Sequence, residues 1–181
     1  MTFNKLAISF LFTASLLLSG CGGDDSKSSS TSTTNTSAAV DTTTITTTSG
    51  KSIQVDKTAN GFVFHGYEGQ VILLEVYGDT CPHCLDAIPA YNRLQAKYAN
   101  SMKVIALESY GTLTNAGMQQ YDTVGKANTG KMFSFIKDLK GYNLQAVPYL
   151  MILSKDGTIV YDKILSDFPE SDIDARIQQL L

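Results

Sequence analysis

The sequence predicts an α/β fold in which a central mixed β-sheet is flanked by helices. Strand-like and helix-like patterns alternate from Lys51 to the C-terminus, as they do in proteins that cover a sheet with helices. A Cys-Pro-His-Cys motif at 81–84 stands between an apolar run and an amphipathic stretch, which indicates a strand, a tight turn and the start of a helix. Near the C-terminus, two further apolar runs flank the turn-forming residues 155–157 and predict an antiparallel hairpin.

The composition fits one globular domain with an N-terminal appendage. The chain has 181 residues and a net charge of −3, and 17% of its residues are charged, so nothing indicates binding to nucleic acid. Hydrophobic residues make up 43% of the chain, which is enough for a core, but only residues 51–181 have the pattern of a folded domain. We expect that domain to be a monomer.

The first 20 residues have the pattern of a signal peptide. Lys5 supplies a positive charge, and residues 6–18 form an apolar stretch that is too short to span a bilayer comfortably. The stretch ends in Leu-Ser-Gly-Cys at 18–21, which resembles the bacterial lipobox. Cleavage before Cys21 and attachment of a lipid to its thiol are therefore expected. The alternatives are an ordinary secretory signal with an incidental cysteine, and an uncleaved anchor.

Residues 21–50 are predicted to be a disordered tether. They are rich in Ser, Thr, Asp and Gly and contain almost no bulky apolar residue, so they cannot bury enough surface to offset the entropy of ordering. A lipid on Cys21 would hold the domain at 51–181 on the periplasmic side of a bacterial membrane. It would also leave Cys81 and Cys84 as the free pair, in a compartment where disulfides persist.

Apolar periodicity and turn signals predict the elements of the domain in order. They are strands at 52–55, 61–65 and 70–77, a helix at 82–99, a strand at 103–107, a partly helical insertion at 112–129, a helix at 131–139, strands at 149–153 and 158–161, and a last helix. The strand at 70–77 is apolar apart from Glu75. The run at 103–107 is apolar enough to be covered on both faces.

Apolar stripes and end signals predict the last two helices. The helix at 131–139 carries Met132, Phe135, Ile136 and Leu139 at helical spacing. In the last helix, Ser171 and Asp174 form a capping pair at the start. Its apolar stripe consists of Ile173, Ile177, Leu180 and Leu181.

Several of these features together resemble the thioredoxin fold over residues 51–181. Besides the motif at 81–84, the resemblance is carried by Glu75 six positions before Cys81, Pro89 five positions after Cys84, Val147-Pro148 at the family's cis-proline, and Asp156-Gly157 at its hairpin turn. The resemblance implies a dithiol–disulfide active site on a mixed sheet, with a modest insertion before the cis-proline strand.

Within the superfamily, residues 69–72 and 88–94 look like the active-site strand and helix of membrane-tethered TlpA/ResA-type proteins. The chain departs from the usual pattern in having Tyr77 and Thr80 where tryptophans flank the site. The resemblance implies a thiol-disulfide oxidoreductase that acts on exported protein thiols or disulfides. It also implies a membrane redox partner and no cofactor.

Cys81 is the expected nucleophile and Cys84 the resolving thiol. At a helix N-terminus, unpaired backbone N–H groups and the helix dipole favour a thiolate on Cys81. Pro82 suits the first helical turn because it has no N–H to satisfy, and a protonated His83 would stabilise the thiolate further. Cys84 would then attack the mixed disulfide that Cys81 forms with a partner.

Glu75 and Pro148 each have a structural and a functional interpretation. A lone acid in a buried strand has a raised pKa whatever its role, and the resemblance adds that Glu75 exchanges a proton with Cys84. Pro148 is either an ordinary loop proline or the family's cis-proline. In the second case Val147 would offer its backbone to a bound peptide.

Two alternatives stand for the direction of electron flow. The Pro-His dipeptide is that of oxidising DsbA-type sites, whereas the scaffold resembles TlpA/ResA-type reductases. We favour a reductase, because the architecture selects partners while the dipeptide tunes the potential. A non-catalytic binding module is a further alternative. Zinc binding by the two cysteines is another alternative. A zinc ion would need two more ligands, and the softer side chains left to supply them are His65 and His83.

Overall fold

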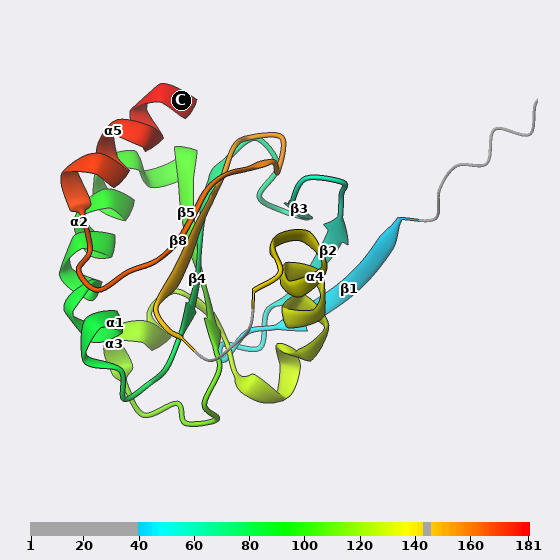
Figure 1. Cartoon of the computed structure of the whole chain (residues 1–181), viewed down its shortest axis with the longest axis horizontal. Coiled ribbons are helices and arrows are strands. Elements are labelled where there is room, and N and C mark those ends of the chain that lie inside the picture. The colour runs from blue at the N-terminus through cyan, green and yellow to red at the C-terminus, as the bar shows by residue number, and fades with distance from the viewer. Residues whose placement is uncertain (1–39, 143–145) are drawn as a thin grey trace, which may run out of the picture. The chain divides into compact units, whose positions relative to one another are not determined.

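The centre of the molecule is strand β4 (Val71–Tyr77), which lies in the middle of a five-stranded sheet (Figure 1). The structure, a computed structural model, describes residues 40–142 and 146–181. The strand order is β6-β5-β4-β7-β8. The other strands are β5 (Met102–Glu108), β6 (Asp122–Val124), β7 (Tyr149–Leu153) and β8 (Ile159–Ile164). Strands β4, β5 and β6 are parallel, whereas β7 and β8 pair antiparallel, so the sheet is mixed as predicted.

A smaller antiparallel sheet of three strands packs near the large one. It contains β1 (Asp41–Thr46), β2 (Ser52–Lys57) and β3 (Phe62–Phe64). Isolated bridges join the two sheets at both edges, from Thr47 to Val124 and from Gly61 to Thr158. The small sheet is therefore part of the same folded unit as the large one.

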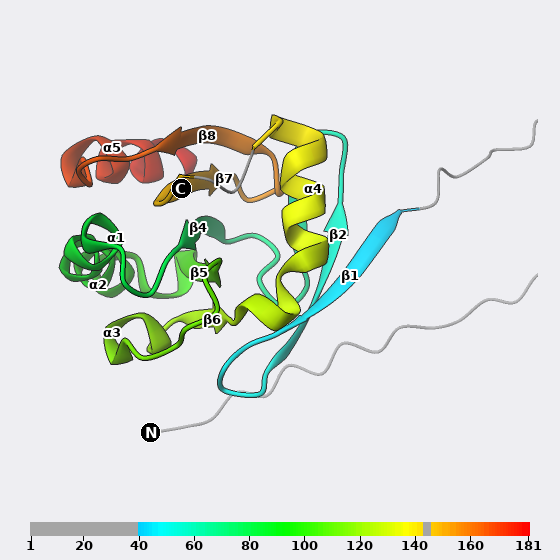
Figure 2. The ribbon, with the colours of Figure 1, turned by 60° about the horizontal axis from the view of Figure 1, so that its bottom comes forward.

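Helices cover both faces of the large sheet (Figure 2). On one face lie α1 (Pro82–Asp86), α2 (Ile88–Tyr98), α3 (Ala116–Gln119) and α5 (Glu170–Leu180). On the other face lie α4 (Gly130–Lys140) and the small sheet. Two short 3-10 helices, η1 (Ala99–Ser101) and η2 (Lys126–Asn128), complete the connections. Within the described residues, none of the helices has the length and apolar character needed to cross a membrane.

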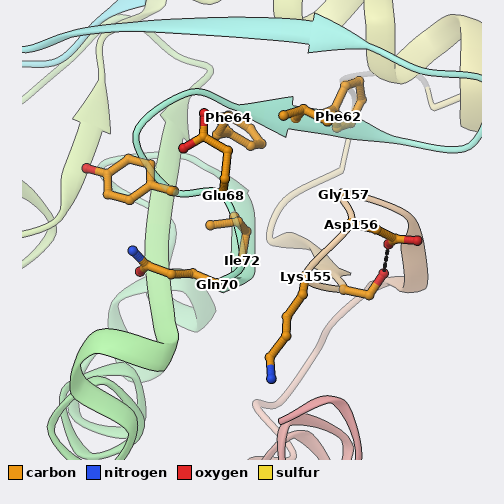
Figure 3. Close-up of a pocket in the computed structure, with 11 residues that line it drawn as sticks. Phe62, Phe64, Glu68, Gln70, Ile72, Lys155, Asp156 and Gly157 are labelled. Atoms are coloured by element: carbon orange, nitrogen blue, oxygen red, sulfur yellow. Dashed lines mark hydrogen bonds between the residues drawn. The ribbon is translucent and has the colours of Figure 1, made fainter. Parts of the chain in front are cut away.

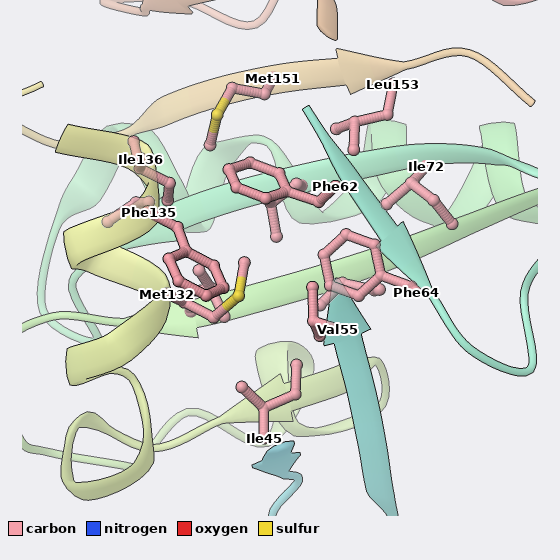
Figure 4. Packing of buried hydrophobic residues seen from close by; sticks show 14 of the residues in the cluster. Ile45, Val55, Phe62, Phe64, Ile72, Met132, Phe135, Ile136, Met151 and Leu153 are labelled. Carbon is pink, nitrogen blue, oxygen red and sulfur yellow. The ribbon is translucent and has the colours of Figure 1, made fainter. Parts of the chain in front are cut away.

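The alternation of side chains along β4 divides the interior into two cores. Ile72, Leu74 and Val76 point toward α4 and the small sheet, where the Phe62 and Phe135 rings stack with centroids 6.4 Å apart (Figure 4). Val71, Leu73 and Tyr77 belong to the opposite core, under α1, α2 and α5. Because Glu75 lies between Leu73 and Tyr77 in this alternation, it faces the second core.

Most predicted elements are confirmed, but the helix expected at 82–99 is two helices. Helix α1 ends at Asp86 and α2 begins at Ile88. Pro89 explains the break, because it has no N–H for the carbonyl four residues earlier and its ring crowds that carbonyl. The Ala87 carbonyl instead accepts hydrogen bonds from the N–H groups of Ala90 and Tyr91, at 3.0 and 3.1 Å.

The tether predicted over residues 21–50 is too long at its C-terminal end. Residues 41–46 form β1, and the Ile45 side chain is fully buried in the core under α4. A Thr-rich composition is compatible with disorder, but Thr and Ile are also β-branched residues that favour strands. Residues 47–50, also assigned to the tether, form the turn from β1 to β2. The predicted signal peptide and residues 21–39 of the tether, including Cys21, lie outside the described residues.

The insertion at 112–129 contains more regular structure than predicted. Besides the short helix α3, it contributes β6, which pairs parallel with β5 through Ile105 and Asp122 and extends the sheet at its edge. Only three residues of β6 pair, so no strand-length apolar run marked it.

The predicted cap of the last helix is also wrong. Helix α5 begins at Glu170, after Pro169, and has no side-chain cap.

Candidate active site

The dithiol motif follows the carboxyl end of β4 and opens α1. The Gly78 carbonyl accepts the Cys81 N–H at 2.9 Å, which closes the turn between the strand and the helix. Cys81 is the N-cap residue of α1, with extended backbone angles, and its sulfur accepts the Cys84 N–H at 3.4 Å. One of the unpaired N–H groups of the first turn is therefore directed at the Cys81 sulfur, as the helix-start argument predicted.

The two cysteines differ in accessibility. Both are free thiols, but Cys81 is partly exposed whereas Cys84 is fully buried. Burial raises the pKa of the Cys84 thiol strongly, and the neighbouring Cys81 and Glu75 raise it further. The Cys81 sulfur is therefore accessible from the surface, whereas the Cys84 thiol is enclosed and protonated.

The Val147-Pro148 segment lies against the exposed cysteine. The peptide bond between these residues is cis, as the resemblance implied, and the Cys81 thiol faces the Val147 carbonyl oxygen at 3.7 Å. The Pro148 carbonyl is held by the Leu165 N–H at 3.0 Å, so the start of β7 is fixed beside the motif. Residues 66 positions apart in the chain thus meet at the reactive sulfur.

Glu75 lies behind the dithiol in the second core. Its side chain is fully buried on β4, between Ala106 of β5 and Leu150 of β7, and neither carboxyl oxygen has a hydrogen-bond partner among the described residues. Burial raises the pKa of Glu75 to about 8. The Tyr91 hydroxyl is near enough to lower that pKa slightly, although it makes no hydrogen bond of ordinary geometry with the carboxyl oxygens. The acid is thus protonated at neutral pH and close to titrating.

Pro82 and His83 are exposed in the first turn of α1. Pro82 occupies the first helical position, where no N–H is needed. The His83 ring makes no hydrogen bond to the Cys81 sulfur or to any other residue that the structure describes. In this structure His83 therefore does not stabilise the Cys81 thiolate by direct contact, as the sequence predicted it would.

Comparisons with known proteins bear on the fold. No protein-family model and no curated protein matches the chain. Among solved structures, a candidate thioredoxin from Neisseria meningitidis matches with a TM-score of 0.57 and 15% identity, over 78% of this chain and 88% of that one. This chain has a thioredoxin fold. The fold class predicted from the sequence is thereby confirmed.

Other proteins with the thioredoxin fold carry more specific descriptions. A structure from Chlorobium tepidum, described as a candidate thiol:disulfide interchange protein DsbE, matches with a TM-score of 0.52 and 19% identity, over 77% of this chain and 91% of that one. A secreted disulfide oxidoreductase from Mycobacterium tuberculosis matches with a TM-score of 0.54 and 16% identity, over 76% and 96%.

This thioredoxin-fold site contains an acid that sequence reasoning missed. Asp79 is nearly fully buried two residues before Cys81, and it accepts the Thr114 N–H at 2.6 Å and the Asn115 N–H at 3.1 Å. Burial acts to raise the pKa of Asp79, but the hydrogen bonds from Thr114 and Asn115 outweigh it and hold the pKa below its usual value. These hydrogen bonds hold the start of the insertion at 112–129 close to the Cys-Pro-His-Cys motif. No local signal pairs two residues that are 35 positions apart.

Tyr110 also shapes the surface near the dithiol. Its ring is half exposed and lies over Gly78, so close that a Cβ on Gly78 would be 2.3 Å from the ring. The Gly78 position therefore needs a residue without a side chain. Tyr110 lies two residues after the end of β5, and its exposure gives the thiol end of the sheet an accessible aromatic ring.

The remaining candidates lie away from the thiols. His65 contacts Asp56 at 2.8 Å and Glu68 at 3.2 Å on the exposed end of the small sheet. A hollow of about 130 Å³ is lined by residues of 62–72 and by the hairpin turn 154–157 (Figure 3). It adjoins Gln70 and Ile72 at the start of β4, whereas Cys81 follows the end of that strand. Across the described part of the chain, no three Cys, His, Asp or Glu side chains converge to hold a metal ion.

Proposed function

We propose that the protein is an exported, membrane-anchored thiol-disulfide oxidoreductase that exchanges the Cys81–Cys84 dithiol with exported protein substrates, acting preferentially as a reductase. The observation that carries the proposal is the pairing of a partly exposed Cys81 at the start of α1 with a buried Cys84 and a facing Val147 carbonyl. Thioredoxin-fold structures described as thiol:disulfide interchange and disulfide oxidoreductase proteins support this class of reaction.

The reductase cycle has two exchange steps. The Cys81 thiolate attacks a substrate disulfide, the substrate S–S bond breaks, and the departing substrate sulfur takes up a proton. Cys84 then attacks the Cys81 sulfur of the mixed disulfide, which releases the second substrate thiol and leaves a Cys81–Cys84 disulfide. Two electrons pass from the dithiol to the substrate, and a membrane redox partner of thiol or dithiol type returns them.

Val147 and Glu75 assist at the two steps. The Val147 backbone, which faces the Cys81 sulfur, is proposed to align an extended substrate segment before the first attack. Glu75 is proposed to accept the Cys84 proton before the second, in its ionised form, which is the minor form at neutral pH and gains population as the pH approaches about 8. Transfer between them, through a buried water, would leave no uncompensated change of charge in the core.

Export and anchoring are proposed on the sequence of residues 1–39. The apolar segment at 6–18 and the lipobox-like residues 18–21 support cleavage before Cys21 and a lipid on its thiol. Residues 21–39 would then tether the domain to the membrane on the periplasmic side. Metabolic labelling with a palmitate analogue tests this: label on the wild type and none on Cys21→Ala supports it, and equal label on both rules it out.

A thiol oxidase is the second candidate, because Pro82 and His83 match the dipeptide of oxidising DsbA-type sites. Reduction of insulin by the full chain in detergent, with Cys81→Ala as the inactive control, tests the exchange reaction itself. A reduction potential of about −270 mV, the value of thioredoxin, supports the reductase, and one of about −120 mV, the value of DsbA, supports the oxidase. Absence of turnover in insulin reduction and in oxidative refolding would favour a binding module instead.

A further inference from the structure

Four buried polar atoms behind the dithiol have no hydrogen-bond partner among the described residues. They are the two carboxyl oxygens of Glu75 and the hydroxyl oxygens of Tyr77 and Tyr91. Tyr77 and Tyr91 belong to the core that holds Cys84, and Glu75 faces that core from β4. Buried polar groups are hydrogen-bonded in most proteins, so a cluster of unpartnered groups beside a reactive thiol indicates a functional arrangement.

The Tyr91 ring is held rigidly in this core. Tyr121 packs against it edge-on with centroids 6.0 Å apart, and Phe168 does so at 4.8 Å. The Tyr121 hydroxyl is already engaged by the Asn92 side-chain oxygen at 2.7 Å, on the surface of α2. The Tyr77 and Tyr91 hydroxyls have no such partner. Of these two, the Tyr91 hydroxyl is the one near enough to the Glu75 carboxyl to lower its pKa as a hydrogen-bond donor.

Among the residues that the structure describes, the groups that act on Glu75 supply no positive charge. The groups that face it are Tyr77 from its own strand, Cys84 from α1, Tyr91 from α2 and Tyr121 from the segment after α3, while Ala106 and Leu150 flank it on β5 and β7. Asp79 and Glu108 are near enough to Tyr77 to raise the pKa of its hydroxyl. A carboxylate formed at Glu75 therefore depends on hydroxyl or thiol donors for its stabilisation.

Tyr91 is suited to donate and not to exchange its own proton. Burial and the nearby Glu75 carboxyl raise the pKa of Tyr91 well above its ordinary value of 10.0. The hydroxyl therefore keeps its proton throughout the range in which Glu75 titrates. A neutral donor of this kind stabilises the carboxylate without competing for the proton that passes between Cys84 and Glu75.

We propose that Tyr91 is a positioning residue for Glu75, within the dithiol function proposed above. Its hydroxyl donates a hydrogen bond to the Glu75 carboxylate, directly or through one buried water, when Glu75 is ready to accept the Cys84 proton. Tyr91 touches neither substrate nor the reacting sulfurs in this role. It acts by setting the pH at which the acceptor is available.

The test follows the Glu75 titration in the reduced full chain in detergent, by carbon-13 NMR of labelled glutamate carboxyls, with Glu75→Gln to assign the signal. In Tyr91→Phe, the midpoint is expected to rise by about one pH unit, because a hydrogen bond to the charged form is lost. Tyr98→Phe is the matched control. It removes a hydroxyl from the same helix, but one bonded to Asp174 at 2.7 Å.

The pH dependence of the rate at which the mixed disulfide is resolved provides a second measurement, which a purely structural role of Tyr91 would leave unchanged. The rate at which Cys84 resolves a preformed mixed disulfide should shift to higher pH in Tyr91→Phe by the same amount as the titration. In a Glu75→Gln background, adding Tyr91→Phe should change the rate no further, since there is no carboxylate to stabilise. An additional loss of similar size in that background overturns the proposal.

An unchanged Glu75 midpoint in folded Tyr91→Phe also overturns the proposal. If that variant does not fold, 3-fluorotyrosine at position 91 preserves the ring and makes the hydroxyl a stronger donor, so the midpoint should fall, and a static midpoint is again decisive against Tyr91. The NMR titration needs no substrate. Failure of the wild type to turn over insulin would therefore count against the proposed function alone, and leave the Tyr91–Glu75 relationship to be judged by its own result.

Discussion

The Cys81 sulfur lies 3.7 Å from the carbonyl oxygen of Val147, the residue whose peptide bond to Pro148 is cis. This contact brings the start of α1 and the start of β7 to one point on the surface. An incoming polypeptide that pairs with the Val147 backbone would present its own sulfur to Cys81, while Cys84 stays enclosed below.

Removal of the buried thiol should trap substrates. In Cys84→Ala, Cys81 can still form a mixed disulfide, but no second thiol is present to resolve it. We therefore expect mixed disulfides with exported proteins to accumulate and to be visible as reducible bands on non-reducing gels. Cys81→Ala is the matched control and should give none. Equal trapping by both variants would show that Cys84 also meets the substrate, which would contradict its enclosed position.

Stability should fall with rising pH because of Glu75. Its pKa is about 8 in the folded protein against 4.5 when unperturbed, so the folded state binds the proton more tightly than the unfolded chain does. The contribution of Glu75 to the free energy of unfolding is fully present below about pH 4.5. It is lost as the pH rises toward 8, at up to about 1.4 kcal/mol per pH unit. Urea denaturation from pH 5 to 8 measures it, and Glu75→Gln should flatten the dependence. An equally steep fall in the variant would assign the effect to other groups.

Gly78 and Tyr110 should be energetically coupled. A Cβ at position 78 would lie 2.3 and 2.4 Å from two carbons of the Tyr110 ring. Gly78→Ala should therefore destabilise the protein by about 1–3 kcal/mol, and Tyr110→Ala in the same chain should recover much of the loss. Gly130→Ala is the control, because nothing lies within 4 Å of a Cβ there. Thermal unfolding of the wild type, Gly78→Ala, Tyr110→Ala and the double variant completes the cycle, and strictly additive effects would contradict the coupling.

The folded domain should require β1. A chain that begins at residue 51 loses the pairing of β1 with β2 and the fully buried Ile45 side chain, whereas one that begins at residue 40 keeps both. We expect the shorter domain to be less stable by at least about 2 kcal/mol in urea denaturation. Ile45→Ala in the longer domain should reproduce a large part of the loss. Equal stability of the two domains would show that β1 is dispensable.

Local signals in the sequence predicted most of the strands and helices and the identity of the redox pair. The apolar run of β4, the Cys-Pro-His-Cys motif and the turn at 155–157 each carry their meaning within a few residues. The errors arose where a local signal was weak or ambiguous. Thr-rich residues 41–46 fit a strand as well as a tether, and the three residues of β6 are too few to show a period. Ser171 is of a residue type that caps helices, but helix α5 already begins at Glu170.

The sequence by itself determined which reactive groups are present: two thiols at a strand-to-helix turn, with an acid six positions before the first. Tertiary structure alone decided which groups surround them. Asp79 holds Thr114, Tyr110 covers Gly78, and Tyr91 stands behind Glu75 as an unpartnered hydroxyl. The physical reason is that periodicity along a chain records which side chains are buried, but not which of them meet. Partners from separate elements are selected only when the sheet and its helices pack.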